Sequence, residues 1–309
     1  MINTDVTIRG GGYLAQLRSD LGGNCYRLCH EATRAEILRS PADENELLHS
    51  RFLFGNPILF PPNRISGGEF VFEGREYRLP INEPATGCHL HGDLHKSKFS
   101  VAELSESEVC FEYSAEAGEY IGWPHAFTVR RRYKIGEDGL YEWVQITNRS
   151  DMPMPFMLAF HTTFNAPFMP GSKTEDCYFE SGVVCEHMRN EKYLPTLEYA
   201  EGRERDLAIR NGSYNVASGA LSAFYKNDTA ASIVTDRRTG AAIVYEADRE
   251  YGYRMLWAKD GGRFIVVEPQ TAAIDCFHID MPPEECGLIV IPSGASRTLK
   301  TRIYLRMGI

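Results

Sequence analysis

Short runs of strand-forming residues, separated by turn signals at regular intervals, cover most of this sequence. The clearest pair is residues 127–135 (FTVRRRYKI) and 140–148 (LYEWVQITN), joined by the turn GEDG. Two runs rich in β-branched and aromatic residues on either side of a short glycine-containing turn are typical of a β-hairpin. Residues 69–79 repeat the pattern around Glu73 and Gly74, and the chain ends in two more such runs. This punctuation favours an all-β chain with mostly antiparallel strands.

Helix-forming sequence is scarce. The best candidate is SPADENELLHSRF, in which we expect Ser40 to cap a short helix over residues 41–49, with Pro41 at the first helical position and Asp43 in the first turn. The 309 residues contain no internal repeat, low-complexity segment or linker. We therefore expect a single domain over residues 1–309, built as one large β structure with few short helices.

The charge balance restricts the classes of partner. The net charge of -9 argues against nucleic-acid or membrane-surface binding, because both require a basic patch. The chain has no apolar run of the roughly 18 residues that a transmembrane helix needs. Its start, MINTDVTIRGGGYLAQL, lacks the basic and apolar regions of a secretory signal, so we expect a cytoplasmic protein. The eight scattered cysteines, with no CxxC pair, then predict free thiols.

The segment GCHLHGDLHKSKF places His89, His91 and His95 within seven residues. Residues two apart on a strand share a face, so His89 and His91 could bind a metal as the HxH pair of cupin-type barrels does. The segment AFHTTFN, with His161 and Asn165, could supply a second motif. However, His95 replaces the glutamate expected after HxH, and the glycine and proline pattern before the second motif is absent. Structural or loop-facing histidines are therefore favoured over metal ligands.

Three other segments place reactive groups at special positions. In LAFHTTFNAPF, His161 leaves an apolar strand among phenylalanines, whose faces suit the C–H faces of a sugar. In RFIVVEPQT, Glu268 ends a continuous apolar run, which predicts a strand buried on both faces and a carboxylate of raised pKa. Pro269 cannot donate to a ladder and favours an extended conformation at Glu268, which we expect at the end of the strand. In FGNPILFPPNRISGG, Asn63 and Arg64 follow a proline-bounded apolar stretch, and an arginine there could donate to hydroxyls or a carboxylate. For each, a purely structural role is the alternative.

Taken in order, five segments resemble the aldose 1-epimerase (galactose mutarotase) family: GNPILFPPNRI, LPINEPATGCHLHG, GWPHAFTVRRRY, TNRSDMPMPFMLAFHTTFN and FIVVEPQT. The resemblance runs from about residue 10 to the C-terminus. It implies a galactose mutarotase-like β-supersandwich with a sugar site in an open cleft, and a role in carbohydrate metabolism. It places a substrate-binding arginine at Arg64, conserved histidines at His91 and His161, and the catalytic glutamate at Glu268. It implies no metal and no cofactor.

The resemblance thus implies an isomerase that interconverts the α and β anomers of a free aldose. From the chemistry of ring opening we expect Glu268 to act as base and His161 as acid. Asn63, beside Arg64, and His89, expected to face the same way as His91, join the expected substrate-binding residues. The expected partner is a small-molecule sugar. The identity and charge of the sugar and the oligomeric state stay open, with a homodimer as one option.

One departure from the family pattern affects the sugar site. An acidic motif that contacts sugar hydroxyls is expected between His161 and Glu268, but the nearest match carries Ser222 and Ala223 instead, and Asp228 lies too far along. A non-catalytic sugar-binding protein on the same fold is therefore the main alternative. A metal-dependent cupin-like enzyme and a polysaccharide lyase or hydrolase are weaker ones, and no second carboxylate motif pairs with Glu268 for hydrolysis.

Overall fold

The computed structural model describes residues 6–308. Its strands form one 15-stranded sheet, one four-stranded sheet and three two-stranded sheets, and the named strands pair in antiparallel fashion. The predicted all-β, antiparallel fold with few helices is therefore confirmed. The expectation of one domain over residues 1–309 extends beyond the described residues at both ends and stays a prediction.

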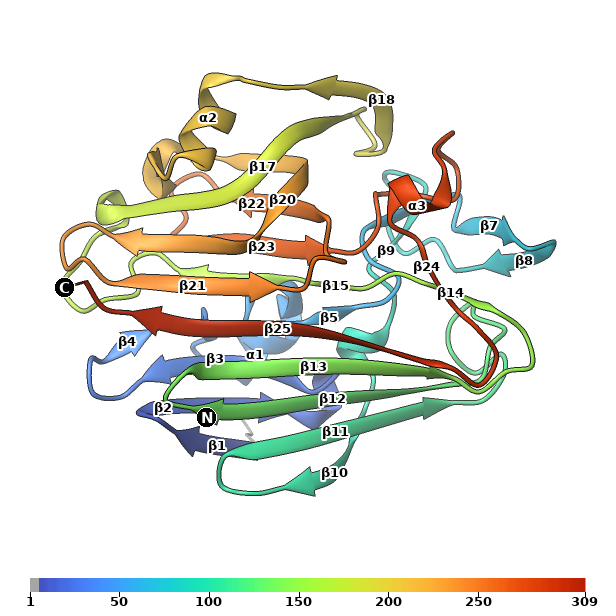
Figure 1. Cartoon of the computed structure of the whole chain (residues 1–309), viewed down its shortest axis with the longest axis horizontal. Coiled ribbons are helices and arrows are strands. Elements are labelled where there is room, and N and C mark those ends of the chain that lie inside the picture. Colours follow the sequence, from blue (N-terminus) through green and yellow to red (C-terminus); the bar gives the residue numbers. More distant parts are fainter. Residues whose placement is uncertain (1–5, 309) are drawn as a thin grey trace.

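The large sheet runs in the order β10-β11-β12-β13-β25-β21-β20-β22-β23-β15-β5, with β16 beside β23, β17 beside β20, and β18 and β19 beside β17. In Figure 1 its strands from β11 to β21 lie side by side, and β17, β18 and α2 lie at the top. Its strands are β5 (Ile58–Leu59), β10 (Ser100–Leu104), β11 (Glu108–Ala115), β12 (Phe127–Gly136), β13 (Gly139–Asn148), β15 (Ala159–Phe160), β16 (Thr162–Asn165), β17 (Cys177–Arg189), β18 (Pro195–Ala200), β19 (Tyr214–Asn215), β20 (Leu221–Asp236), β21 (Ala242–Ala247), β22 (Tyr253–Ala258), β23 (Phe264–Gln270) and β25 (Ser296–Arg306).

The small sheets and helices fill the periphery. The sheets are β1 (Val6–Gly10), β2 (Tyr13–Arg18), β3 (Asn24–His30) and β4 (Ala35–Glu36); β14 (Met154–Phe156) with β24 (Ile289–Ile291); β6 (Arg64–Ser66) with β9 (Cys88–Leu90); and β7 (Glu69–Phe72) with β8 (Arg75–Arg78). The helices are α1 (Glu44–His49), α2 (Glu204–Arg210) and α3 (Pro283–Cys286), with short 3-10 turns at Ser19–Leu21, Arg51–Leu53, Leu94–Lys96, Thr174–Asp176 and Val216–Ser218. None of the helices within residues 6–308 is long and apolar enough to cross a membrane.

The predicted hairpins form where the sequence places them. β12 and β13 pair from Phe127 with Asn148 down to Gly136 with Gly139, and β7 and β8 close around Glu73 and Gly74. Along β12 buried and partly exposed residues alternate, as a strand with one face on the core requires. None of the eight cysteines, all within residues 6–308, forms a disulfide, as predicted.

The expected helix begins later than its sequence suggests. Helix α1 starts at Glu44, and Asp43, not Ser40, is the N-cap, because the Asp43 side chain accepts a hydrogen bond from the backbone N–H of Glu46. The Glu46 carboxylate in turn accepts from the N–H of Ala42, the residue before the N-cap. The carboxylate three residues before Glu46 was thus the better cap, and the prediction of Pro41 inside the helix was wrong.

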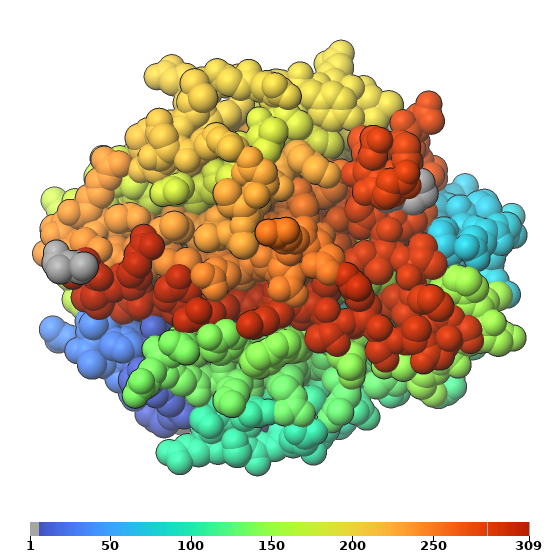
Figure 2. All heavy atoms as spheres, in the orientation of Figure 1, coloured from blue at the N-terminus to red at the C-terminus, as the bar shows by residue number. Residues whose placement is uncertain are grey.

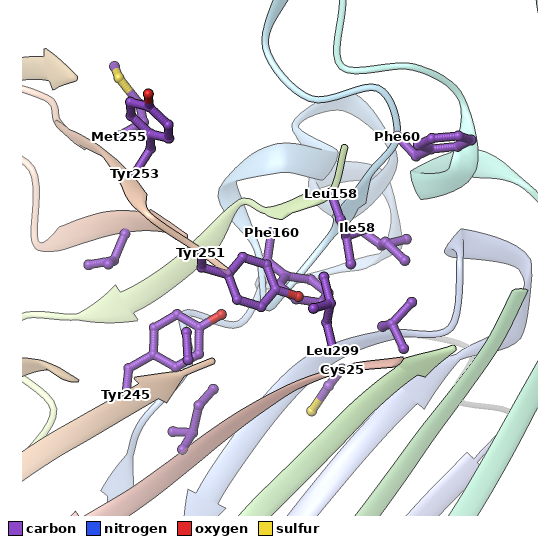
Figure 3. Packing of buried hydrophobic residues seen from close by; sticks show 14 of the residues in the cluster. Cys25, Ile58, Phe60, Leu158, Phe160, Tyr245, Tyr251, Tyr253, Met255 and Leu299 are labelled. Carbon is purple, nitrogen blue, oxygen red and sulfur yellow. The ribbon is translucent and has the colours of Figure 1, made fainter. Parts of the chain in front are cut away.

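The main core is a large hydrophobic cluster that joins the four-stranded sheet to the large sheet, and a second, small cluster consists of Leu21, Tyr26, Leu47 and Phe54. In Figure 1 the smaller sheet lies behind β12 and β13. Figure 2 shows the same face packed with side chains, with β25 crossing its middle. Figure 3 shows the rings of Phe160 and Tyr251 beside each other in this core, with centroids 6.1 Å apart. Because Phe160 immediately precedes His161, core packing fixes the backbone that carries the histidine.

A buried polar network connects the hairpin to the same region. Arg131 of β12 pairs with Glu142 of β13 at 2.7 Å, and both side chains are almost completely buried. Arg131 also donates to the Asn56 carbonyl oxygen at 2.6 Å, and the Asn56 amide donates to Glu142 at 2.7 Å. The Asn56 side-chain oxygen accepts from the Thr162 hydroxyl at 2.6 Å. The network therefore fixes both residue 56 and the residue that follows His161.

Candidate active site

A cleft of about 410 Å³ opens where β6, β9 and β17 end beside strands β20, β22 and β23. Most of the titratable residues that the sequence singled out lie in its wall. It is lined by Leu53, Asn63, Arg64, Glu83, His91, His161, Arg189, Tyr193, Ser222, Met255, Trp257 and Glu268.

An interruption in the large sheet brings His161 to Glu268. Strand β23 pairs with β16 as far as Thr162 opposite Val267, and then with β15 at Ala159 opposite Gln270. Between these pairs the neighbouring chain leaves the ladder, and the His161 N–H donates to the Pro57 carbonyl oxygen. The His161 Nε2 and Glu268 Oε1 atoms lie 3.6 Å apart beside this gap.

The same interruption explains one error of the sequence analysis. Strand β23 does not end at Glu268 but continues through Pro269 to Gln270. Proline has no N–H to donate, and it is tolerated here because the ladder on one side of β23 is already broken. Glu268 consequently lies inside a fully buried strand rather than at its end.

The carboxyl group of Glu268 is buried, and burial raises its pKa to about 8, against the Gln270 hydrogen bond and the positive charges of Arg189 and Arg64. The Gln270 amide donates to Glu268 Oε2 at 3.1 Å, which leaves Oε1 to face His161. A carboxyl group with this pKa can exchange a proton near neutral pH.

His161 is also buried, and burial lowers its pKa to about 4, against the attraction of the His161 and Phe52 carbonyl groups. Between about pH 4 and about pH 8 the two side chains therefore share a single proton, which rests on Glu268. The order of the two pKa values is the reverse of a free glutamate and a free histidine.

His91 is held by Asn63 in a fixed tautomer. Two hydrogen bonds join these residues. The backbone N–H of His91 donates to the Asn63 carbonyl oxygen at 3.0 Å, and the backbone N–H of Asn63 donates to His91 Nδ1 at 3.2 Å. Burial, with the nearby His161 and His95, lowers the pKa of His91 well below its usual value. A neutral ring that accepts at Nδ1 carries its proton at Nε2, so His91 is a hydrogen-bond donor for the cleft.

The glycine that follows His91 is required by close packing. A Cβ atom on Gly92 would lie 1.8 Å from the Phe60 carbonyl oxygen, and the residue has a φ of +60°. His91 itself has a φ of 67°, so it no longer follows the alternation of strand β9. The expectation that His89 and His91 share a strand face therefore fails at this turn.

Arg64 is fixed by a carboxylate that the sequence analysis did not consider. Its Nε and Nη2 atoms each lie 2.7 Å from an oxygen of Glu83 in a two-pronged ion pair. Although burial opposes it, hydrogen bonds from Arg64 and Thr86 lower the pKa of Glu83. The guanidinium of Arg64 lies over the Tyr193 ring, 4.6 Å from its centroid.

The cleft contains further polar and aromatic residues that sequence reasoning missed: Arg189, Tyr193, Ser222, Met255 and Trp257. Ser222 was noted only as the replacement for an acidic residue. It lines the cleft and accepts a hydrogen bond from Arg189, whereas Ala223 is buried in the core. No spacing signal marks Arg189, because its position depends on how β17 pairs with β20 in the sheet.

His89 and His95 do not line this cleft. His89 is buried and hydrogen-bonds to the Pro80 carbonyl oxygen at 2.8 Å. His95 packs on the Phe52 ring, with centroids 4.5 Å apart, and His91 and His161 contact the same ring. Within residues 6–308 no group of three or more histidine, cysteine or acidic residues could hold a metal ion.

A second hollow of about 440 Å³ lies over β11, β12, β13 and β25. Its arginines, Arg130 and Arg132, form ion pairs with Glu103, Glu108 and Glu112 on the surface. Buried titratable groups that face one another are found in the first cleft and not in this one.

A sequence model of one protein family, described as aldose 1-epimerase, matches residues 4–304. The chain belongs to the aldose 1-epimerase family. In this family member the residues singled out by the family motifs, Arg64, His91, His161 and Glu268, lie together in one cleft, although about 200 residues separate the first from the last.

Two sequence relatives of this aldose 1-epimerase family member are less than 30% identical to it. LacX of Lactococcus lactis is 24% identical over 221 residues, which are 69% of this chain and 72% of that protein. YphB of Escherichia coli is 28% identical over 119 residues, which are 38% of this chain and 39% of YphB. The matched segment thus spans well under half of YphB.

Solved structures share the fold. A galactose mutarotase-like protein from Clostridium acetobutylicum superimposes with a TM-score of 0.91 at 24% identity, over 97% of this chain and 94% of that one. An aldose epimerase homologue from Caenorhabditis elegans superimposes with a TM-score of 0.80 at 16% identity, over 98% and 99% of the two chains. The predicted galactose mutarotase-like fold is therefore confirmed.

Proposed function

We propose that this protein is a cofactor-independent aldose 1-epimerase, an isomerase that interconverts the α and β anomers of a free aldose. The observation that carries the proposal is the buried pair of Glu268 and His161, whose Oε1 and Nε2 atoms lie 3.6 Å apart in the wall of the cleft. The pair holds one proton near neutral pH, which is what a reaction with one base and one acid requires.

The chemistry requires one proton to leave the substrate and one to enter it. Glu268 removes the proton of the C1 hydroxyl, the C1–O5 bond breaks, and its electron pair goes to the ring oxygen, which takes a proton from His161. The open-chain aldehyde then rotates about C1–C2. Glu268 returns its proton to the carbonyl oxygen, and His161 removes the proton from O5 as O5 attacks the other face of C1.

The reactive protonation state is reached within the pair. At rest the shared proton is on Glu268, and moving it to His161 creates a carboxylate base and an imidazolium acid without exchange with solvent. A small approach of the two side chains brings their 3.6 Å separation to hydrogen-bond distance. Hydrogen bonds from the substrate hydroxyls to the Glu268 carboxylate favour this form, because they replace the solvation that burial removed.

The other side chains hold the sugar. His91 donates from Nε2 to the ring oxygen or a neighbouring hydroxyl, and Arg64, fixed by Glu83, donates to hydroxyls. Tyr193 and Trp257 offer aromatic faces for the C–H faces of the ring. Asn63 acts through His91, which it holds in the donating tautomer.

The test is the rate of anomer exchange with Glu268→Gln and His161→Asn. We expect the enzyme-catalysed rate on freshly dissolved α-glucose or α-galactose, measured by polarimetry, to fall by roughly 10²–10⁴-fold in each variant. His187→Asn is the matched control, because His187 is buried but outside the cleft. Unchanged rates in both cleft variants would overturn the assignment, and saturable sugar binding without faster exchange by wild type would identify a non-catalytic sugar-binding protein.

A further inference from the structure

Arg189 is a partly buried cation of the cleft without a carboxylate partner. Its Nη2 atom donates to the Ser222 carbonyl oxygen at 2.8 Å and to the Ser222 hydroxyl at 3.1 Å, and its Nη1 atom contacts the Met255 sulfur at 3.6 Å. Among residues 6–308 no ion pair forms with this guanidinium, and its Nε–H has no hydrogen-bond partner. Burial lowers the pKa of Arg189, so the fold holds this charge at a cost.

Arg64, the second arginine of the cleft, adds to the free-energy cost of holding a positive charge on Arg189. Arg64 and Arg189 both lie against the Tyr193 ring, 4.6 and 5.7 Å from its centroid, and the charge of Arg64 disfavours the charged form of Arg189. Glu83 neutralises Arg64 alone. Glu186 is the acidic group that most favours the charged form of Arg189, but its carboxylate is ion-paired with Arg203 and Arg205. Glu268 holds the shared proton at neutral pH, so Arg189 has no carboxylate of its own and the cleft carries its positive charge.

Strands β20 and β22 lie between the strand of Arg189 and that of Glu268, although the charge of Arg189 still opposes the rise in the pKa of Glu268. Ser222, which anchors it, lies on β20 opposite Trp257 of β22, and Met255 of β22 lies opposite Glu268 of β23. Arg189 is therefore on the β20 side of the cleft, with the Met255 side chain between its strand and that of Glu268. A sugar whose C1 meets Glu268 and His161 can direct a substituent of its far end toward Arg189.

We propose that the substrate is an aldose that carries an anionic group on the carbon farthest from C1, and that Arg189 binds this group. Carboxylate, phosphate and sulfonate groups share the chemistry that a guanidinium recognises, which is a cluster of charged oxygen acceptors. Ser222, which anchors Arg189, is uncharged, and a carboxylate at that position would repel such a substrate. The inference rests on the proposed anomer exchange only for the orientation of C1.

The experiment compares anionic and neutral aldoses by NMR exchange spectroscopy between anomers at equilibrium. The probes are glucose, glucuronate, glucose 6-phosphate and 6-deoxy-6-sulfoglucose. For wild type we expect kcat/KM on at least one anionic aldose to exceed that on glucose by about 10-fold or more. In Arg189→Gln this anionic-to-neutral ratio should fall by about 10-fold or more, and Arg189→Lys should retain part of it.

Lys192→Gln is the matched control, because Lys192 is an exposed cation on the turn that follows Arg189 and does not line the cleft. It should leave the ratio within about 2-fold, since a solvent-exposed charge is screened. A wild type that prefers glucose, or an Arg189→Gln ratio equal to that of wild type, would overturn the inference.

The result separates this inference from the proposed function. If wild type exchanges glucose anomers but shows no anionic preference, only the inference fails. If no aldose is exchanged faster than in buffer, the proposed function fails, and equilibrium titration with glucose 6-phosphate and glucose then decides the inference. The inference is supported if wild type binds glucose 6-phosphate more tightly than glucose and Arg189→Gln abolishes this difference. Equal affinities of wild type for the two sugars contradict it.

Discussion

At the scale of single residues, the site depends on groups whose charge is set by burial. Glu268 and His161 have pKa values shifted in opposite directions, the first up and the second down, because both side chains are removed from water. His91 stays neutral for the same reason, and its tautomer is fixed by one backbone N–H. Arg64 and Glu83, in contrast, form an ion pair in which the two opposite charges compensate each other.

Because burial raises the pKa of Glu268, we expect the ionised form of this residue to lower the free energy of unfolding. Its carboxyl has a pKa near 4.5 when free and about 8 in the fold, so the folded protein is most stable with Glu268 protonated and loses stability as the pH rises from about 4.5 through about 8. Glu268→Gln removes this loss. Its free energy of unfolding relative to wild type should rise by the order of a few kcal/mol between about pH 5 and about pH 8.5, measured by urea denaturation. Glu198→Gln, at an exposed position on β18, should show no such trend, and an equal difference at both pH values would refute the burial argument.

Arg64 is expected to act in binding more than in the chemical step. Because it is held by Glu83 and offers its remaining donors to hydroxyls away from C1, Arg64→Gln should raise KM by about 10-fold or more and change kcat much less. Steady-state exchange rates over a range of sugar concentrations give both constants. Arg75→Gln, on the exposed hairpin strand β8, is the control and should leave KM unchanged. A loss confined to kcat would place Arg64 in the chemical step instead.

At the scale of elements, the site is built from irregularities in otherwise regular strands. The gap between β15 and β16 directs His161 to Glu268, and the left-handed turn at His91 and Gly92 takes the histidine out of strand β9. The sequence predicted the strands themselves from their composition and turns. The sequence did not predict the gap between β15 and β16 or the turn at His91 and Gly92. The end of a strand and an interruption in a strand beside a proline have the same local sequence pattern.

The buried Arg131–Glu142 pair links these elements and predicts a large stability effect. Arg131→Met leaves Glu142 buried without its ion-pair partner, so the free energy of unfolding should fall by about 3 to 5 kcal/mol, measured by urea denaturation. Arg130→Gln is the matched control on the same strand, because the partly exposed Arg130 pairs with Glu103 at the surface. It should cost less than about 1 kcal/mol. Equal losses in the two variants would show that the buried network does not support the fold as argued.

At the scale of the whole molecule, the cleft joins segments far apart in the sequence. Arg64, His91, His161 and Glu268 could be predicted because each lies in a short motif of the family, and the structure brings all four into one cleft. The sequence did not predict that Arg189, Tyr193 and Glu83 line the cleft. They lie at the end of β17, in the turn after it and in the loop before β9, and only the packing of these segments brings them to the cleft. His89 was expected near the sugar from strand alternation, and the turn at His91 places it elsewhere.

The central claim is that one proton, shared by Glu268 and His161, serves anomer exchange. It is tested most directly by the pH dependence of the wild-type rate, followed by NMR exchange spectroscopy. Below about pH 4 the pair holds two protons and lacks a base, and above about pH 8 it holds none and lacks an acid. We predict a plateau in the rate between these limits with a fall on both sides, and the loss of that profile in Glu268→Gln. A rate that keeps rising above pH 8, or a profile unchanged in Glu268→Gln, would contradict it.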